Sequence, residues 1–439
     1  MKKTTKNQST TSADKAKIRE RAKIAKTVQQ TIPYLAAYPC GVLQVAPTRF
    51  ARAYALGDVN FTTADPDEQE ELFESFCLAL NALSEADVQI CCMNRTVDIE
   101  TFKKKHFLQF RNDGLDIYRN EVNEILVRNL DGGKSITNDK YLVLTINAEN
   151  IDMAMQQFQR LDSTVVDVMN DVGGAEARAL TMEEWLGVLY QVYNPHSDEV
   201  FHVNFDDLKA QGLTTKDAIA PESMQVKTNK MMLGETHAAS LVLTKFPASL
   251  TTDFIADINN LPCHLVTGIH FTAIQQDKSV KMVRNQLTNI NSNIVDQQKK
   301  AAQKGYSAGL ISPDLESARN EAMDLLADIT GKNQRLYYAT MTITVYADDE
   351  EQLKELLKLV QSIGQKYVVR LNKMDYQQDN GLNTSAPMGL CDVHINSLLT
   401  TEAAALFIPF PSPVLWRWSL RRSTGCWAPR SARKRWFAT

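Results

Sequence analysis

No uninterrupted apolar run in this 439-residue sequence reaches the ~18–20 residues that a membrane-spanning helix needs. The N-terminus, MKKTTKNQST, also lacks the apolar core of a secretory signal. Seven cysteines are scattered without a CxxC pair, which argues against a disulfide framework or a zinc knuckle and favours a reducing compartment. Together these absences predict a protein that stays in the cytoplasm.

A phosphate-binding loop, GxxxxGK[ST], is also missing, and with it the backbone cradle and lysine that hold a nucleoside triphosphate. The nearest match runs from Arg128 to Ser135, with Arg128 in place of the first glycine and Lys134 at the lysine position. Its context is reversed, because a helical stretch leads into a strand. We interpret it as a helix-to-strand turn. We expect no catalytic residue, no nucleotide-binding residue and no cofactor in this chain.

Two other patterns resemble sites by their letters alone. Gly305–Gly309 matches GxSxG, with Ser307 as nucleophile, but a hydrolase elbow follows a buried strand and this segment follows a polar helical stretch. We interpret it as a loop. His264 and His270 share one face of a predicted strand, about 20 Å apart at ~3.3 Å per residue, too far to ligate one ion. We expect both histidines at the surface and Phe271 on the buried face.

The remaining candidates are single histidines and adjacent cysteines. His196 and His202 lie in a loop without the spacing of metal ligands, so we expect no metal there. Cys91 and Cys92 point to opposite faces of a predicted strand and are expected to be small core or edge thiols. The sequence therefore predicts no metal site.

The net charge of −4 conceals three unlike regions. Residues 1–30 hold nine Lys or Arg against two acids, residues 412–439 hold seven Lys or Arg and no acid, and the part between them carries −18 by difference. A basic segment can contact acidic lipid headgroups or nucleic acid. For residues 1–30 we favour a solvated arm, disordered over 1–13 and helical from about 14 to 30.

Strand and helix patterns occur twice in the same order. The first half predicts strands over 41–61, 87–94, 140–147 and 178–180, with helices over 65–83, 101–130, 151–160 and 181–193. The second half predicts strands over 239–246, 263–274, 336–346 and 367–371, with helices over 251–261, 278–304, 313–329 and 348–363. Two βαβ units with right-handed crossovers make a ferredoxin-like sheet with helices on one face. We predict an α/β (α+β) protein of two such lobes, 31–195 and 236–410, joined by an irregular linker over 196–235.

Two helices of the second half carry narrow apolar seams. Val280, Val283, Leu287, Ile290 and Ile294 recur every three or four residues, as do Ala318, Ala322, Leu325 and Ile329. The loop at 305–309 allows an antiparallel helical hairpin. We expect the hairpin to pack on the sheet, with a partner contact as the alternative.

Several stretches along the chain resemble, in order, the start of the CagE/TrbE/VirB-type ATPases of conjugative type IV secretion systems, particularly those of Gram-positive conjugative elements. They are Lys26–Tyr34, Gly41–Val45, Asp58–Phe61, Tyr118–Asn123, Ser312–Leu315, Gln377–Asn383 and Leu399–Phe410. The resemblance implies a hexameric motor at the cytoplasmic face of the membrane. The family's N-terminal domain docks on membrane components of the channel, and its RecA-like C-terminal domain hydrolyses ATP to drive assembly and transfer.

After Phe410 the sequence departs from this family. Residues 411–439 contain four of the five tryptophans and no acid. This change is typical of translation in a shifted frame, and a genuine basic tail that binds membrane or RNA is the alternative. We therefore expect a truncated N-terminal docking module without catalysis, peripheral on the inner face of the membrane, which meets DNA only indirectly. A single-stranded nucleic-acid-binding α/β module is the alternative function, and it needs exposed aromatics on the sheet.

Overall fold

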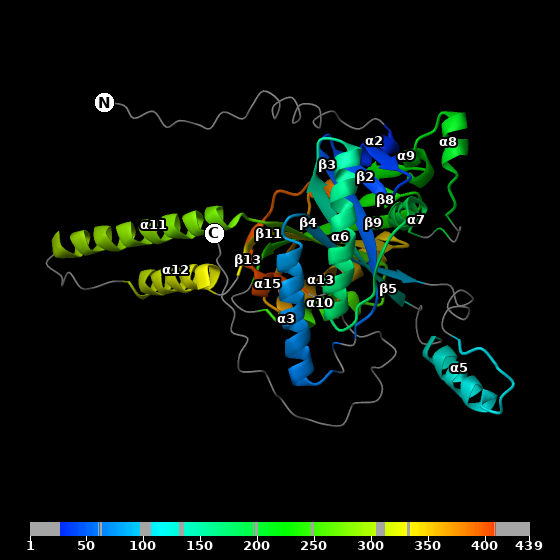
Figure 1. Ribbon diagram of the computed structural model, residues 1–439, viewed down its shortest axis with the longest axis horizontal. Helices are drawn as coiled ribbons and strands as arrows, with labels where there is room; N and C mark the ends of the chain where they lie inside the picture. Colours follow the sequence, from blue (N-terminus) through cyan, green and yellow to red (C-terminus); the bar gives the residue numbers. More distant parts are fainter. Residues whose placement is uncertain are drawn as a thin grey trace.

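The computed structural model describes residues 27–59, 61, 64–96, 107–130, 136–195, 197, 201–246, 250–303, 312–331, 334–407 and 409. These residues form one 13-stranded sheet in which every strand pairing is antiparallel, with helices packed around it (Figure 1). The α+β class predicted from the sequence is confirmed.

The first lobe is a ferredoxin-like unit. Its elements are β3 (Arg49–Leu56), α3 (Pro66–Ala82), β4 (Asp87–Thr96), β5 (Ile136–Asn147), α6 (Ile151–Asp171) and β6 (Ala177–Ala179). The strands lie in the order β6-β3-β5-β4. Helix α3 begins where Asp65 accepts a hydrogen bond from the Glu68 N–H and Pro66 fills the first turn. Local capping signals thus place the first crossover helix.

The second lobe repeats this arrangement. Its elements are β9 (Thr236–Lys245), α10 (Asp253–Asn259), β10 (Leu265–Ala273), β11 (Leu336–Ala347), α13 (Glu350–Lys366) and β12 (Arg370–Lys373). The strands lie in the order β12-β9-β11-β10. The prediction of two similar lobes is therefore confirmed at the level of strand order.

Each lobe carries a helical insertion between its second and third strands. In the first lobe the insertion contains α5 (Asp116–Leu130). In the second it contains α11 (Gln276–Gln303) and α12 (Pro313–Gly331), which pack against each other as an antiparallel hairpin through the predicted seams. Figure 1 shows this hairpin projecting away from the sheet, so the expectation that it packs on the sheet holds only for its base, where Val283 and Ile329 meet Leu336. Beyond this base the seam residues pack within the hairpin.

The two lobes are joined through their second strands. Strand β4 pairs with β10 in antiparallel register, from Val88 opposite Phe271 to Asn94 opposite Leu265. Across this junction the Asn94 side chain donates to the carbonyl oxygens of Asn259 and Leu261, at 2.8 and 3.2 Å. The lobes therefore share one continuous sheet, which the sequence did not predict.

Helices cover both faces of this sheet, whereas one covered face was predicted. Buried side chains of α3, α6, α10, α13 and α15 (Thr401–Ala405) pack on one face. Helix α7 (Met182–Tyr193) and α14 (Gln378–Ser385) contribute buried residues to the core on the other. The second covered face explains why polar residues of the central strands are buried.

The segment 196–235, predicted to be an irregular linker, contains regular structure where it is described. It includes α8 (Phe205–Gln211), α9 (Thr215–Ile219), β7 (Met224–Val226) and β8 (Met231–Leu233), and β8 extends the sheet from β9. The remaining elements are α2 (Val28–Thr31), β1 (Ala36–Tyr38), β2 (Val42–Ala46) and β13 (Ser397–Thr400). The low apolar content of segment 196–235 obscured the few residues that anchor this segment, of which Ile219 and Met231 are fully buried.

Candidate functional site: an inter-lobe strap, its cavity and two insertions

The segment Gln377–Asn383, one of the stretches that carry the family resemblance, forms most of α14 and bonds this helix to the sheet. The Gln378 side chain accepts from the Ser240 N–H at 2.7 Å and donates to the Met374 carbonyl at 2.8 Å. A Cβ atom at Gly381 would lie 2.4 Å from the Ser240 Cβ, so the helix approaches β9 this closely only with glycine. These residues therefore have a structural reason to occur together.

Asn383 ends the same segment and connects three parts of the chain. Its Oδ1 accepts from the Tyr193 hydroxyl at 2.7 Å, and its Nδ2 donates to the Thr31 carbonyl at 2.8 Å. Since Tyr193 ends α7 and Thr31 ends α2, this amide holds the N-terminal segment and α7 against α14. A buried amide with both ends bonded contributes a defined geometry as well as stability.

From the last two residues of α14 onwards the chain crosses the junction between the lobes as a strap (residues 384–396). Gln89 on β4 donates to the carbonyl oxygens of Thr384 and Ala386, at 3.2 and 2.8 Å, and accepts from the Gly389 N–H at 2.7 Å. The Trp185 indole donates to the Pro387 carbonyl at 2.7 Å. One side chain of β4 and one of α7 thus satisfy backbone groups of the strap that are buried from water.

The second lobe holds the same strap. His270 on β10 is only 8% exposed, and its Nε2 lies 2.8 Å from the Thr384 carbonyl, which makes Nε2 the protonated nitrogen. The Thr344 hydroxyl lies 2.7 Å from that of Ser385. The strap is therefore a bridge between the lobes, bonded to β4 and α7 on one side and to β10 and β11 on the other.

A cavity of about 260 Å³ opens beside the strap, at one end of the central strands. Its lining combines an ion pair, Arg49 with Asp87, with His270 and the strap residues Cys391 and His394. Such a lining offers a cation, an anion and an imidazole within one space. It can hold a small polar molecule or ordered water through hydrogen bonds.

The electrostatics of this cavity keep His270 neutral. Burial lowers the pKa of His270 to about 4, and the positive charge of Arg49 acts in the same direction. Burial also raises the pKa of the Cys391 thiol above its ordinary value. At neutral pH the His270 imidazole is therefore neutral and the Cys391 thiol is protonated, so these two side chains can bind a polar group and do not form an activated pair.

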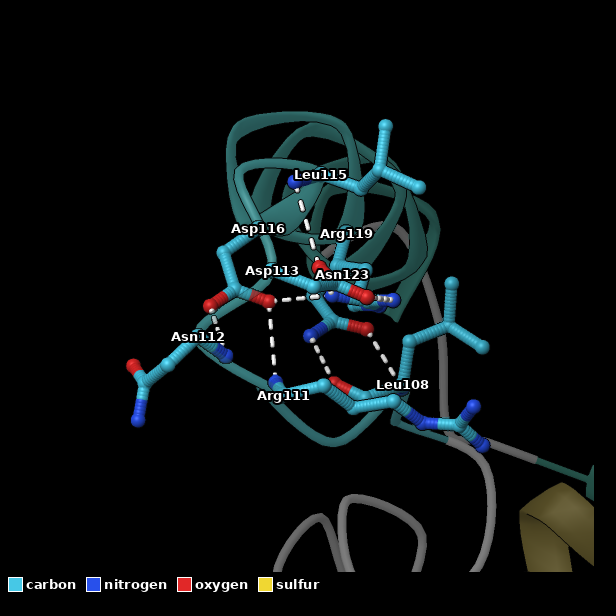
Figure 2. A network of polar contacts seen from close by, with 8 residues as sticks. All are labelled: Leu108, Arg111, Asn112, Asp113, Leu115, Asp116, Arg119 and Asn123. Atoms are coloured by element: carbon cyan, nitrogen blue, oxygen red, sulfur yellow. Dashed lines mark hydrogen bonds and ion pairs between the residues drawn. The ribbon is translucent and has the colours of Figure 1, made fainter.

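The insertion of the first lobe is a small unit with its own polar network, here called the α5 module (residues 107–124) (Figure 2). Asp116 accepts from the backbone N–H groups of Arg111 and Asn112, at 3.0 and 2.8 Å. Asn123 accepts from the Leu108 N–H at 2.9 Å and donates to the Leu108 carbonyl at 3.0 Å. The segment before α5 is thereby fixed against the helix.

Arg119 completes the network by pairing with both Asp113 and Asp116. Its hydrogen bond lowers the pKa of Asp113 to about 2. The pKa of Asp116 is also lowered, first by the hydrogen bond from the Arg111 N–H and then by Arg119. Both carboxylates are therefore ionised throughout the physiological range. They hold the turn in one conformation.

The α5 module exposes an unusual number of apolar side chains. Ile117 is 77% exposed and Tyr118 is 65% exposed. Four more large apolar side chains of the module are exposed with them: Leu108, Phe110, Leu115 and Val122. Several exposed large apolar side chains on one short preformed unit are a feature of binding sites for other proteins.

The residues singled out from the sequence lie in different places. Lys134, Ser307 and His196 lie outside the described residues. His202 is exposed and pairs with Glu183. His264 and His270, predicted at the surface, are both buried, so that prediction is wrong. It assumed that the second face of the sheet was open, whereas α7, α14 and the strap cover it.

The predictions for the central strands' apolar and thiol side chains are confirmed. Cys91 and Cys92 are both buried in the core, and burial raises the pKa of Cys92 to about 11. Phe271 is completely buried. Gln89 was missed because a glutamine in a strand is read as a surface residue. The importance of Trp185 had an indirect signal in the sequence, since Trp185 is the one tryptophan outside the last 29 residues.

Comparisons with known proteins place no further limit on the site. No protein-family model matches this chain, and a search of curated proteins finds no match to it. Among the described residues, no three His, Cys, Asp or Glu side chains are grouped so that they could hold a metal ion. Within that same part of the chain, no helix has both the length and the apolar character needed to cross a bilayer.

Proposed function

We propose that this chain is the N-terminal docking and assembly module of a conjugative type IV secretion ATPase of the CagE/TrbE/VirB type. In this proposal the module is a binding element without catalysis, and the family's nucleotide chemistry belongs to a separate motor domain. The module sits peripherally on the cytoplasmic face of the membrane, where it binds membrane components of the conjugation channel. DNA is met only indirectly, and the assembled form is a homo-oligomer.

The exposed apolar surface of the α5 module is the observation that carries this proposal. The module includes Tyr118–Asn123, one of the stretches that carry the family resemblance, in which Tyr118 and Val122 are exposed. The network around Arg119 fixes the surface before any partner binds, which lowers the entropy lost on binding. The strap and the β4–β10 pairing hold the two lobes together.

The alternative function, a single-stranded nucleic-acid-binding module, requires aromatic side chains on an open face of the sheet. Phe271, the aromatic that the sequence offered for this role on β10, is completely buried. Residues from α7 and α14 join the core on the face that such modules leave open. Nothing in the described residues favours this alternative.

Sedimentation with membranes tests the docking function. Membrane vesicles from cells that carry the conjugation machinery are compared with vesicles from cells that lack it and with protein-free liposomes. We expect the chain to sediment with the first and with neither of the others. The Ile117→Asp, Tyr118→Asp double variant should bind at least tenfold less, because its charges must be desolvated at an apolar contact. Leu78→Asp is the matched control, since Leu78 is 64% exposed on α3.

Two results would contradict the proposal. The first is equal sedimentation of the wild-type chain with all three kinds of vesicle, or of the double variant and the wild type with the machinery-bearing vesicles. The second is ATP turnover by the purified chain that is lost when Lys134 is replaced by alanine, since a docking module has no such activity.

A further inference from the structure

The cavity beside the strap lies between the strap and one face of the sheet, at the junction of the two lobes. Four adjacent strands, β5, β4, β10 and β11, supply its floor, and their register places the following lining residues on that same face: Thr145, Asp87, His270 and Thr340. The volume of about 260 Å³ is below the ~300–1,000 Å³ of pockets for drug-sized ligands and well above the ~30 Å³ of one water molecule. The cavity therefore has the size for a molecule of a few heavy atoms.

The lining contains one ion pair that a ligand can reach. Arg49 and Asp87 are the one arginine or lysine and the one carboxylate among the described residues that line the cavity, and each side chain is 31% exposed. Their contact joins Nη2 of the guanidinium to Oδ2 of the carboxylate. A guanidinium has five N–H donors and a carboxylate has two oxygens. Most donors of Arg49 and the Oδ1 atom of Asp87 therefore remain for a ligand.

His270 adds a buried acceptor to this ion pair. Its Nε2 donates to the Thr384 carbonyl, so Nδ1 of the neutral ring carries a lone pair, and Nδ1 has no hydrogen-bond partner within the described part of the chain. His270 pairs across the strands with Gln89, two residues after Asp87, so His270 and Asp87 are diagonal neighbours. Diagonal neighbours on antiparallel strands lie roughly 7–8 Å apart, and one donor group between the two side chains can reach both acceptors.

This lining selects against a ligand with a single charge. An anion attracted by Arg49 also meets the carboxylate of Asp87, and a cation attracted by Asp87 also meets the guanidinium. A ligand with both charges close together satisfies both side chains. An α-amino acid is such a ligand, because its ammonium and its carboxylate are bonded to the same carbon atom.

We propose that the cavity binds a small free α-amino acid, with its carboxylate on Arg49 and its ammonium between Asp87 and Nδ1 of His270. Asn396 lines the same space, and its Oδ1 accepts from the Thr340 hydroxyl at 2.7 Å, which leaves the amide Nδ2 as a second donor for the carboxylate. Because the floor of the cavity belongs to both lobes, an occupant stabilises their junction. This inference does not depend on the docking function of the α5 module.

Thermal unfolding with four small probes, each at 20 mM and equal ionic strength, tests the inference. Glycine carries both charges on one carbon, acetate and methylammonium carry one charge each, and 4-aminobutyrate carries both charges with three carbons between them. We expect glycine to raise the melting temperature by about 1–2 °C, because a ligand that binds the folded state stabilises it. Each of the other three probes should raise it by less than half as much.

Two variants that each remove one charge should change which probe binds. Asp87→Asn leaves Arg49 unopposed, so acetate should now raise the melting temperature and glycine should lose its advantage. Arg49→Gln leaves Asp87 unopposed, so methylammonium should do so. A gained response cannot come from a variant that fails to fold. Asp139→Asn is the matched control, because Asp139 forms an ion pair with Arg95 on the central strands outside this cavity and should leave all four responses unchanged.

Alkylation of cysteines by iodoacetamide locates the bound probe. Cys391 is half-buried and lines the cavity, so glycine should slow its alkylation at least threefold, as measured by mass spectrometry of its peptide. The exposed thiol of Cys40 is the control and should react at an unchanged rate. Acetate that stabilises the wild type as much as glycine would overturn the inference and indicate a simple anion site. A glycine effect that leaves the Cys391 rate unchanged would also overturn it, because the ligand would then bind elsewhere.

Discussion

Gln89 and His270 face each other across the junction between the lobes, and both donate to the carbonyl oxygen of Thr384. Gln89 comes from the first lobe and His270 from the second, whereas Thr384 lies more than a hundred residues after His270 along the chain. One acceptor therefore joins three distant parts of the sequence. Because this contact is buried, its loss costs more than the loss of a surface hydrogen bond.

Replacing Gln89 with alanine should destabilise the fold strongly. The change removes three hydrogen bonds and leaves the carbonyls of Thr384 and Ala386 and the N–H of Gly389 without that partner. We expect a loss of about 2–4 kcal/mol in the free energy of unfolding, measured by urea denaturation. Gln156→Ala, on the exposed side of α6, should change it by less than ~0.5 kcal/mol. Similar losses for both variants would show that the strap contributes little.

The stability of the protein should fall as the pH is lowered through the range in which an unfolded histidine titrates. The pKa of His270 is about 4 in the folded protein and ~6.5 in an unfolded chain, so the unfolded state binds the proton first. Its contribution is thus present above pH ~6.5 and lost as the pH falls towards 4, on the order of 3 kcal/mol in all.

His270→Gln keeps a donor for the Thr384 carbonyl and removes this titration. Urea denaturation at pH 7.5, 6, 5 and 4.5 should show the wild type losing stability faster than the variant. A constant difference between the two proteins at every pH would mean that His270 does not titrate as its burial requires.

Gly389 should not tolerate a side chain. Its φ is +70°, and an added Cβ would lie 2.2 Å from the Thr145 Oγ1, which itself donates to the Gly389 carbonyl at 2.9 Å. We expect Gly389→Ala to lower the melting temperature and to cost about 2–5 kcal/mol, from left-handed strain together with the clash. Gly174→Ala is the matched control, because Gly174 has φ +72° and open space around it. It should cost only the strain, about 1–2 kcal/mol. Equal losses would mean that the strap shifts freely.

The turn before α5 should depend on a single carboxylate. In Asp116→Asn the side chain keeps its shape but loses its negative charge. The carboxylate that pairs with Arg119 and accepts from two backbone N–H groups is then replaced by an amide with one acceptor oxygen. We expect hydrogen exchange at the Arg111 and Asn112 amides to become about tenfold faster or more. Asp152→Asn, an exposed change on α6, should leave these amides unchanged. Unchanged exchange in Asp116→Asn would mean that the turn is held by other contacts.

Local signals were sufficient to predict the elements of both lobes. The capping box that opens α7, formed by Thr181 and Glu184, is present in the structure. The seam residues of the α11–α12 hairpin, such as Val283 and Leu325, pack together as their spacing predicted. In both cases the deciding residues are close in sequence, so the pattern contains the contact.

The inter-lobe contacts could not be predicted in this way. Gln89 and His270 have the polarity of surface residues. Their burial follows from a strap almost three hundred residues after one of them and over a hundred after the other. The sequence of strand β4 likewise gives no local sign that the edge facing away from β5 pairs with β10 instead of being exposed to solvent. The sequence also left the direction of the α11–α12 hairpin undetermined, because the same seam fits a projecting hairpin and one packed on the sheet.

Strands β4 and β10 occupy the same position in their two lobes, and each would otherwise leave an open ladder of backbone groups at the edge of its sheet. By pairing with each other, the two strands satisfy both rows of backbone groups, so either lobe alone would expose an unpaired strand edge. The architecture is that of a homodimer contained in one polypeptide, since two copies of a single lobe meeting through this strand would build the same central sheet. The covalent connection removes the need for symmetry. It is what allows one lobe to carry a single helix in its insertion and the other a helical hairpin.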